Sequence, residues 1–196
     1  MIPRHLQITS MLLLLCVLIS GTFIISLTHR EKARTQPQGE ESPLTPPVEG
    51  KPELIPLLIA YDDDHAMRWR NAQAVLPQDS SLRAKQILRT LLIQYLQTPS
   101  PHPLAKGSDI KEVYLINNST AVIDTTAQFA DGHPSGILLE ELTLASLIET
   151  LSANMPGIVR VKFLVNGKER ETLAGHADLT SFYESSAVHE LAKEYE

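Results

Sequence analysis

The sequence has a single cysteine and no cluster of basic residues, and both shortages exclude classes of protein. Cys16 has no partner within the chain, so neither an intrachain disulfide nor a cysteine zinc site can form. Lys and Arg number 17 against 23 Asp and Glu, which gives a net charge of −6. Because proteins bind nucleic-acid phosphates through Lys and Arg that displace counterions, no nucleic acid is expected as a partner. A length of 196 residues excludes large multidomain enzymes.

Residues 11–27 form an uncharged, mostly aliphatic run that extends back to residue 6. Such a run is long enough to cross about 30 Å of hydrocarbon as a helix, so residues 1–27 are predicted to be a transmembrane anchor. A cleaved secretory signal is one alternative, although its apolar region usually spans about 7 to 15 residues and only Ser20 and Gly21 offer small side chains for a cut. Lipidation of Cys16 is another, but Leu15 stands where the processing peptidase needs a small residue.

The charges around this run give conflicting signals about its orientation. Arg4 precedes it and Arg30, Lys32 and Arg34 lie after it, so the positive-inside bias alone would keep the rest of the chain in the cytoplasm. A lone N-terminal anchor, by contrast, generally exports the domain on its C-terminal side. Residues 28–52 are also rich in proline and poor in aliphatic side chains, which is typical of a flexible tether. We therefore expect a single-pass cell-membrane protein whose soluble domain is extracytoplasmic.

Residues 53–179 carry the patterns of one folded domain. An amphipathic helix is predicted after the N-cap candidates Asp79 and Ser80, because its apolar residues recur at helical spacing as far as Leu96. A second, more apolar helix is predicted over residues 137–153. Strands are predicted over residues 55–61, 67–75, 110–116, 120–124 and 159–165, and Asn166-Gly167 predicts a hairpin after the last of them.

These elements predict an α+β domain with the order β-β-α-β-β-α-β-β, in which two helices pack on a mainly antiparallel sheet. A two-residue turn at Asn166-Gly167 would place Lys162 opposite Glu171. The same register would put Lys168 and Arg170 on the apolar face, so we expect a bulge or a sheet edge there. Residues 180–196 are predicted to be a polar C-terminal tail of low order.

Four segments in this order resemble the GerMN domain family, which is named for spore germination and sporulation. They read LIPLLIAYDDD, SLRAKQILRTLLIQYLQTP, VYLINNSTAVIDTTAQF and MPGIVRVKFLVNGKERETLAGHADLT, and together they span most of residues 54–179. The resemblance implies a bacterial envelope protein with a non-catalytic role in envelope or spore-coat assembly. This chain differs from family members that carry a lipid anchor or two such domains.

Three groups of side chains include residue types that serve in catalysis or metal binding. Asp62, Asp63, Asp64 and His65 include metal-ligating types, but consecutive side chains of an extended segment point to opposite faces, which favours a solvated turn. Asp131, His133 and Ser135 include the types of a catalytic triad, but alternate residues of a Pro-Gly loop rarely converge, and no Gly-x-Ser-x-Gly motif accompanies them. His176 comes directly after Gly175 and is interpreted as a turn or surface histidine. The weak alternative site comprises Asp64, His65, His133 and His176.

Two further features could contact a partner. Arg83, Lys85 and Arg89 lie on the polar face of the first helix and could bind an acidic partner or an anionic wall polymer. Trp69, between Arg68 and Arg70, could stack on a sugar, although a tryptophan in this pattern is usually a core residue.

The sequence therefore predicts a membrane-tethered, extracytoplasmic, non-catalytic interaction domain in envelope assembly, with sporulation or germination as one setting. Its expected partners are envelope proteins or peptidoglycan, and no cofactor or metal is expected. The alternatives are a cell-wall-modifying hydrolase that uses the groups at 62–65 or 131–135, and a module that binds a small ligand or a wall polymer.

Overall fold

The computed structural model describes residues 52–196, which belong to the second of the two compact units of the chain, Pro47–Glu196. The predicted anchor and nearly all of the predicted tether lie outside the described residues. Within residues 52–196, no helix has the length and apolar character that a membrane span requires.

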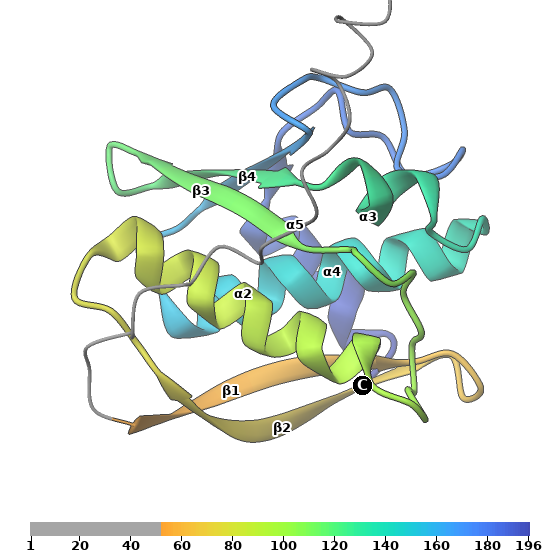
Figure 1. Cartoon of the computed structure of the whole chain (residues 1–196), viewed down its shortest axis with the longest axis horizontal. Coiled ribbons are helices and arrows are strands. Elements are labelled where there is room, and N and C mark those ends of the chain that lie inside the picture. Colours follow the sequence, from red (N-terminus) through yellow and green to blue (C-terminus); the bar gives the residue numbers. More distant parts are fainter. Residues whose placement is uncertain (1–51) are drawn as a thin grey trace, which may run out of the picture. The chain divides into compact units, whose positions relative to one another are not determined.

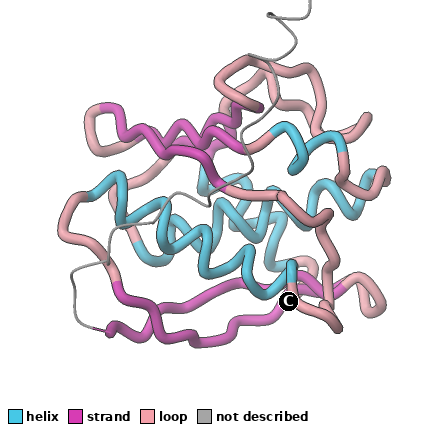
Figure 2. The backbone as a smooth tube through the Cα atoms, in the orientation of Figure 1, coloured by secondary structure: helices cyan, strands magenta, loops and turns pink. Residues whose placement is uncertain are grey.

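Two sheets enclose a layer of helices in this unit (Figures 1 and 2). Strands β1 and β2 form a two-stranded sheet on one side, and strands β3, β4, β5 and β6 form a four-stranded sheet on the other. Helices α2 and α4 lie between them, and α5 packs on α4. In chain order the elements are β1 (Pro52–Tyr61), β2 (Ala66–Val75), α2 (Ser80–Leu96), β3 (Ile110–Ile116), β4 (Thr120–Thr125), α3 (Ala127–Asp131), α4 (Ile137–Asn154), β5 (Arg160–Val165), β6 (Tyr183–Glu184) and α5 (Ser185–Lys193).

Both predicted helices are confirmed. The carboxylate of Asp79 caps α2 by accepting a hydrogen bond from the backbone N–H of Leu82 at 2.9 Å. The apolar stripe of α2 is buried except at Leu96, which is 39% exposed. Helix α4 is buried on nearly every side from Leu142 to Leu151, because it contacts β1, α2 and α5. This arrangement accounts for the spread of apolar residues around its circumference.

The prediction of a single sheet is wrong, because residues 52–196 form two sheets. The α+β class is confirmed, and the strand pairs are mainly antiparallel as predicted, with β4–β5 as the exception. Strands β3 and β4 pair as an antiparallel hairpin, in which Asn117 and Asn118 adopt positive φ angles of 51° and 54°. Strands β4 and β5 are parallel. The connection between them, which contains α3 and α4, returns the chain to the end of the sheet at which β4 begins. The pair β1–β2 lies on the opposite side of the helices and does not join this sheet.

The hairpin predicted after β5 ends almost as soon as it begins. Asn166 and Gly167 make the turn with φ angles of 54° and 76°, but only Val165 and Lys168 then pair before the chain leaves the sheet. Lys162 is 5% exposed and lies 3.4 Å from Glu169, so the predicted pairing with Glu171 is wrong. The Lys162 ammonium also donates to the backbone carbonyl of Thr180, which satisfies this buried cation.

Residues 180–196 are ordered, which contradicts the prediction of a tail of low order. Strand β6 pairs with β5, and α5 comes directly after it. Helix α5 buries Val188 and Ala192 at 6% and 0% exposure, which explains why the segment folds. The backbone carbonyl of Tyr195 accepts a hydrogen bond from the backbone N–H of Met67 in β2 at 2.7 Å, so the end of the chain also contacts the two-stranded sheet.

Candidate functional site: a groove between α4 and α5

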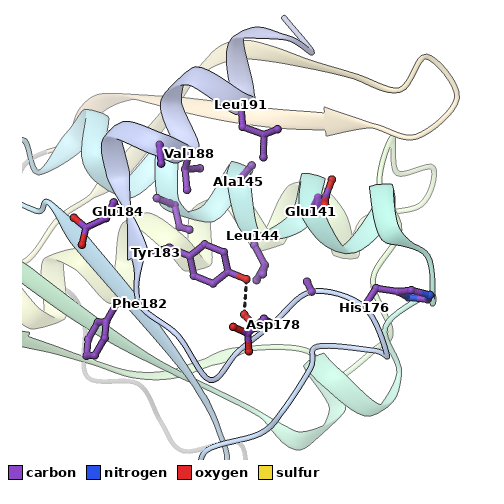
Figure 3. A pocket seen from close by; sticks show the side chains of 13 residues that line it. Glu141, Leu144, Ala145, His176, Asp178, Phe182, Tyr183, Glu184, Val188 and Leu191 are labelled. Carbon is purple, nitrogen blue, oxygen red and sulfur yellow. Dashed lines mark hydrogen bonds between the residues drawn. The ribbon is translucent and has the colours of Figure 1, made fainter.

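A groove of about 460 Å³ lies between α4, α5 and the segment that leads into α5 (Figure 3). Both helices line it with residues at positions i, i+3, i+4 and i+7, so each presents one stripe of side chains to the groove. The stripe on α4 consists of Glu141, Leu144, Ala145 and Ile148. The stripe on the α5 side consists of Glu184, Ala187, Val188 and Leu191.

The groove has a buried apolar floor and an acidic rim. Leu144 and Val188 are 2% and 6% exposed, whereas Phe182 on the rim is 50% exposed. Glu141 and Glu184 lie on opposite sides of the apolar side chains in Figure 3. Among the described residues that line the groove there is no Lys or Arg. The site is therefore apolar in the middle and negatively charged at its edges.

Asp178 adds a third carboxylate to this rim. The Thr180 hydroxyl and backbone N–H donate to it at 2.6 and 2.8 Å, and these hydrogen bonds lower its pKa to about 2. The Tyr183 hydroxyl donates to the backbone carbonyl of Asp178, which fixes the aromatic ring against the groove (Figure 3). Asp178 is thus ionised at neutral pH.

The walls of the groove are fixed by two buried carboxylates of α4. Glu140 is fully buried and accepts hydrogen bonds from the backbone N–H groups of Ala174, His176 and Ala177. Burial opposes its ionisation, but these bonds and the Nδ1–H of His176 outweigh burial and lower its pKa to about 2. Glu149 binds Nδ1 of His189 on α5 at 2.8 Å. Segments on both sides of the groove are therefore tied to α4.

A second polar cluster is buried between α4 and the loops. Nδ1 of His102 donates to Asp62 at 2.5 Å, and Nε2 of His102 and of His133 lie 2.6 and 2.7 Å from the hydroxyl of Thr143. Nδ1 of His133 donates to the carbonyl of Pro134. Burial lowers the pKa of His133 and favours its neutral form. The Thr143 hydroxyl joins the two rings.

Asp131, His133 and Ser135 do not form a triad, in agreement with the expectation that alternate residues of this loop would not converge. Asp131 binds Arg170 at 2.5 Å, and both ring nitrogens of His133 are engaged by Pro134 and Thr143. His133 therefore has no nitrogen left to act on Ser135. His102, from a proline-rich segment, was not among the predicted site residues, yet its contacts with Asp62 and Thr143 link one predicted group to the other.

The weak alternative site is also dispersed. Asp64 pairs with Arg68 at 2.6 Å, His176 binds Glu140, and His133 is buried beside Thr143. His65 sits in the turn between β1 and β2 with a φ of 49°. Over residues 52–196, no group of three or more His, Cys, Asp or Glu side chains is placed to hold a metal ion.

Each residue of the predicted basic face has an acidic neighbour within the domain. Arg83 binds Glu53, and Lys85 and Arg89 bind Glu112 and Asp109, both at 2.9 Å. These pairs reduce the positive charge that the face presents to a partner. Trp69 is 39% exposed, so the expectation of a core residue is wrong, and its indole N–H donates to Glu196 at 3.1 Å.

One wall of the groove escaped prediction because its residues, from Phe182 to Leu191, lie in the segment that was assigned to the tail. One signal was present: Val188, Leu191, Ala192 and Tyr195 recur at helical spacing. The groove itself could not be found this way, since it requires α4 and α5 to pack against each other.

The family model described as "Germane: Sporulation and spore germination" matches residues 60–171. The chain therefore belongs to the Germane family, and the predicted resemblance to GerMN domains is confirmed. No curated protein matches the sequence.

One solved structure supports the same fold, and two others are similar to the chain at lower TM-scores. The tandem GerMN domains of the sporulation protein GerM from Bacillus subtilis match with 20% identity and a TM-score of 0.50, over 67% of this chain and 45% of that one. The first GerMN domain of the same protein matches with 18% identity and a TM-score of 0.46, over 66% and 94%. A putative lipoprotein from Clostridium perfringens matches with 16% identity and a TM-score of 0.44, over 69% and 89%. The chain thus spans less than half of the tandem-domain structure.

Proposed function

We propose that this chain is a membrane-tethered, extracytoplasmic binding domain that helps to assemble or maintain the bacterial envelope, including that of the spore, without turning over a substrate. The groove between α4 and α5 carries the proposal, because it is a preformed concave surface with an apolar floor. Membership of a family described by sporulation and spore germination supports the same role.

The side chains of the groove suit binding better than catalysis. Its histidine, His176, donates Nδ1–H to the buried Glu140, and Asp178 is held as a stable carboxylate by Thr180, which lowers its pKa to about 2. A general base would need a pKa nearer to the working pH. The alternative of a wall hydrolase relied on His65 and His133, which lie in an exposed turn and in a buried cluster respectively.

The location of the domain is tested by reporter fusion. Alkaline phosphatase, which is active only outside the cytoplasm, is fused to the C-terminus of the full chain. We expect active reporter in the membrane fraction, because residues 11–27 have the length and composition of an anchor. A fusion that is inactive, while a cytoplasmic reporter at the same position is active, would overturn the proposed location.

The role is tested by binding and hydrolysis assays on the full chain in detergent. We expect it to retain envelope proteins or to sediment with peptidoglycan, and to leave wall turbidity unchanged. Loss of turbidity that His133→Ala abolishes would instead support the hydrolase.

A further inference from the structure

The groove between α4 and α5 has charges at its ends and an apolar centre. Glu141 begins the stripe on α4, and Glu184 is the N-cap residue of α5. Figure 3 places them on opposite sides of Leu144, Ala145 and Val188. An occupant that complements this surface has an apolar side chain in the middle and a positive charge on each side.

We propose that the groove binds a segment of a partner protein in which one large apolar side chain is flanked by Lys or Arg. This rests on the proposed function in one respect, that the partner is a protein. The stripes at i, i+3, i+4 and i+7 run for two helical turns, which is about 10 Å and matches three to four residues of extended peptide.

Charge selects this occupant over an anionic one. Three carboxylates, those of Glu141, Asp178 and Glu184, line the groove without a Lys or Arg among the described lining residues. Wall polymers and lipid headgroups that carry phosphate would meet like charges there, which disfavours their binding. A Lys or Arg side chain gains chiefly from Glu141 and Glu184, because Lys162 already interacts with the charge of Asp178.

The exposed ring of Phe182 adds apolar surface to the rim, and the cations that contact it belong to the domain itself. The Arg160 guanidinium lies 5.5 Å from its centroid and the Lys162 ammonium 5.9 Å, so this ring already takes part in cation–π contacts within the domain. Half of the side chain stays exposed beside the groove.

The groove is also held open before the partner arrives. The bonds of Glu140 to the 174–177 segment and of Glu149 to His189 fix both walls on α4. Binding therefore requires little ordering of the domain, and more of the contact energy becomes affinity.

The test selects nine-residue peptides from a random phage library on the full chain in detergent. One variant, Ala187→Trp, fills the groove from an exposed helix position. A second, Glu141→Gln with Glu184→Gln, removes two rim charges. Its matched control, Asp63→Asn with Glu171→Gln, removes two exposed charges outside the groove.

We expect enriched peptides to carry a large apolar residue flanked by Lys or Arg. Fluorescence anisotropy of one such peptide should show about tenfold weaker binding to the Glu141/Glu184 variant, since two exposed ion pairs contribute about that much together. Ala187→Trp should abolish binding, and the control should leave it unchanged. Circular dichroism and thermal unfolding confirm that every variant is folded.

Three results would overturn the inference: no enrichment, enrichment without a preference for Lys or Arg, and equal weakening by the control variant. Failure of the inference can be told apart from failure of the proposed function. If Ala187→Trp still retains the same envelope proteins as the unmodified chain, the groove is not the binding site although the function stands. If peptides bind as expected but the alkaline phosphatase fusion is inactive, the proposed location fails and the inference about the groove stands.

Discussion

The buried carboxylate of Glu140 on α4 accepts a 2.8 Å hydrogen bond from Nδ1 of His176, a residue 36 positions further along the chain. With the three backbone amides that share this carboxylate, the contact attaches the segment before β6 to α4. The wall of the groove therefore depends on one ionised side chain inside the domain.

The first prediction concerns stability at low pH. The pKa of Glu140 is about 2 in the folded protein against an ordinary value of 4.5. Its contribution is fully present above pH 4.5 and is lost as the pH falls toward 2, and it is on the order of 3 kcal/mol. Urea unfolding at pH 7 should show that Glu140→Gln lowers the free energy of unfolding by most of this amount. At pH 2 the variant and the unmodified protein should have nearly the same free energy of unfolding. An equal difference at both pH values would contradict the assignment.

The second prediction concerns the hydroxyl that joins His102 and His133. Thr143→Val keeps the shape of the side chain but leaves both Nε2 atoms without that partner. We expect the free energy of unfolding to fall by about 2 to 6 kcal/mol, from about 1 to 3 kcal/mol for each of the two buried nitrogen atoms left unpaired. Thr143→Ser keeps the hydroxyl and is the control. Equal stability of the Val and Ser variants would show that the cluster contributes nothing through this oxygen.

The third prediction concerns α5. Val188→Asp places a charge at a position that is 6% exposed, and should lower the free energy of unfolding by about 3 kcal/mol or more. Ala187→Asp, on the exposed side of the same helix, should have little effect. Trp69 is the only tryptophan and binds Glu196, so its emission should shift to longer wavelength in the Val188 variant alone. An unchanged spectrum and stability would mean that the C-terminal segment does not dock.

The fourth prediction separates the basic face of α2 from the groove. Arg83→Gln, Lys85→Gln and Arg89→Gln together should lower the free energy of unfolding by about 1 to 2 kcal/mol, since each ion pair is partly exposed. Binding of the partner segment should be unchanged in anisotropy measurements, because these cations already have acidic partners. A loss of binding in a folded triple variant would place the partner on α2.

Local patterns predicted those parts of the fold that local interactions determine. The cap at Asp79, the apolar stripe of α2 and the Asn117-Asn118 turn depend on residues close in sequence, and the structure has each of them. The parallel pairing of β4 with β5 depends on where α4 lies in space. So does the separation of the β1–β2 sheet from the four-stranded sheet. Periodicity within a strand does not carry that information.

The candidate site was harder to predict for the same reason. His176 was identified as a turn or surface histidine, but its partner Glu140 lies on another element and had no distinguishing pattern. The Asp62–His102 pair joins a turn to a proline-rich loop. Trp69 was expected in the core because Met67 and Trp69 alternate with arginines, yet only Met67 is covered, and Trp69 contacts the end of the chain instead.

The most direct test of the groove as a binding site is photo-cross-linking in living cells. A photoreactive amino acid replaces Ala187 on the rim, or Ala127 on α3 as an exposed control, in the full chain. We expect a cross-link from position 187 to an envelope protein, through a segment that contains Lys or Arg beside an apolar residue, and none from position 127. Cross-links from position 127 but not from 187, or to cytosolic proteins only, would contradict both the proposed groove and the proposed location.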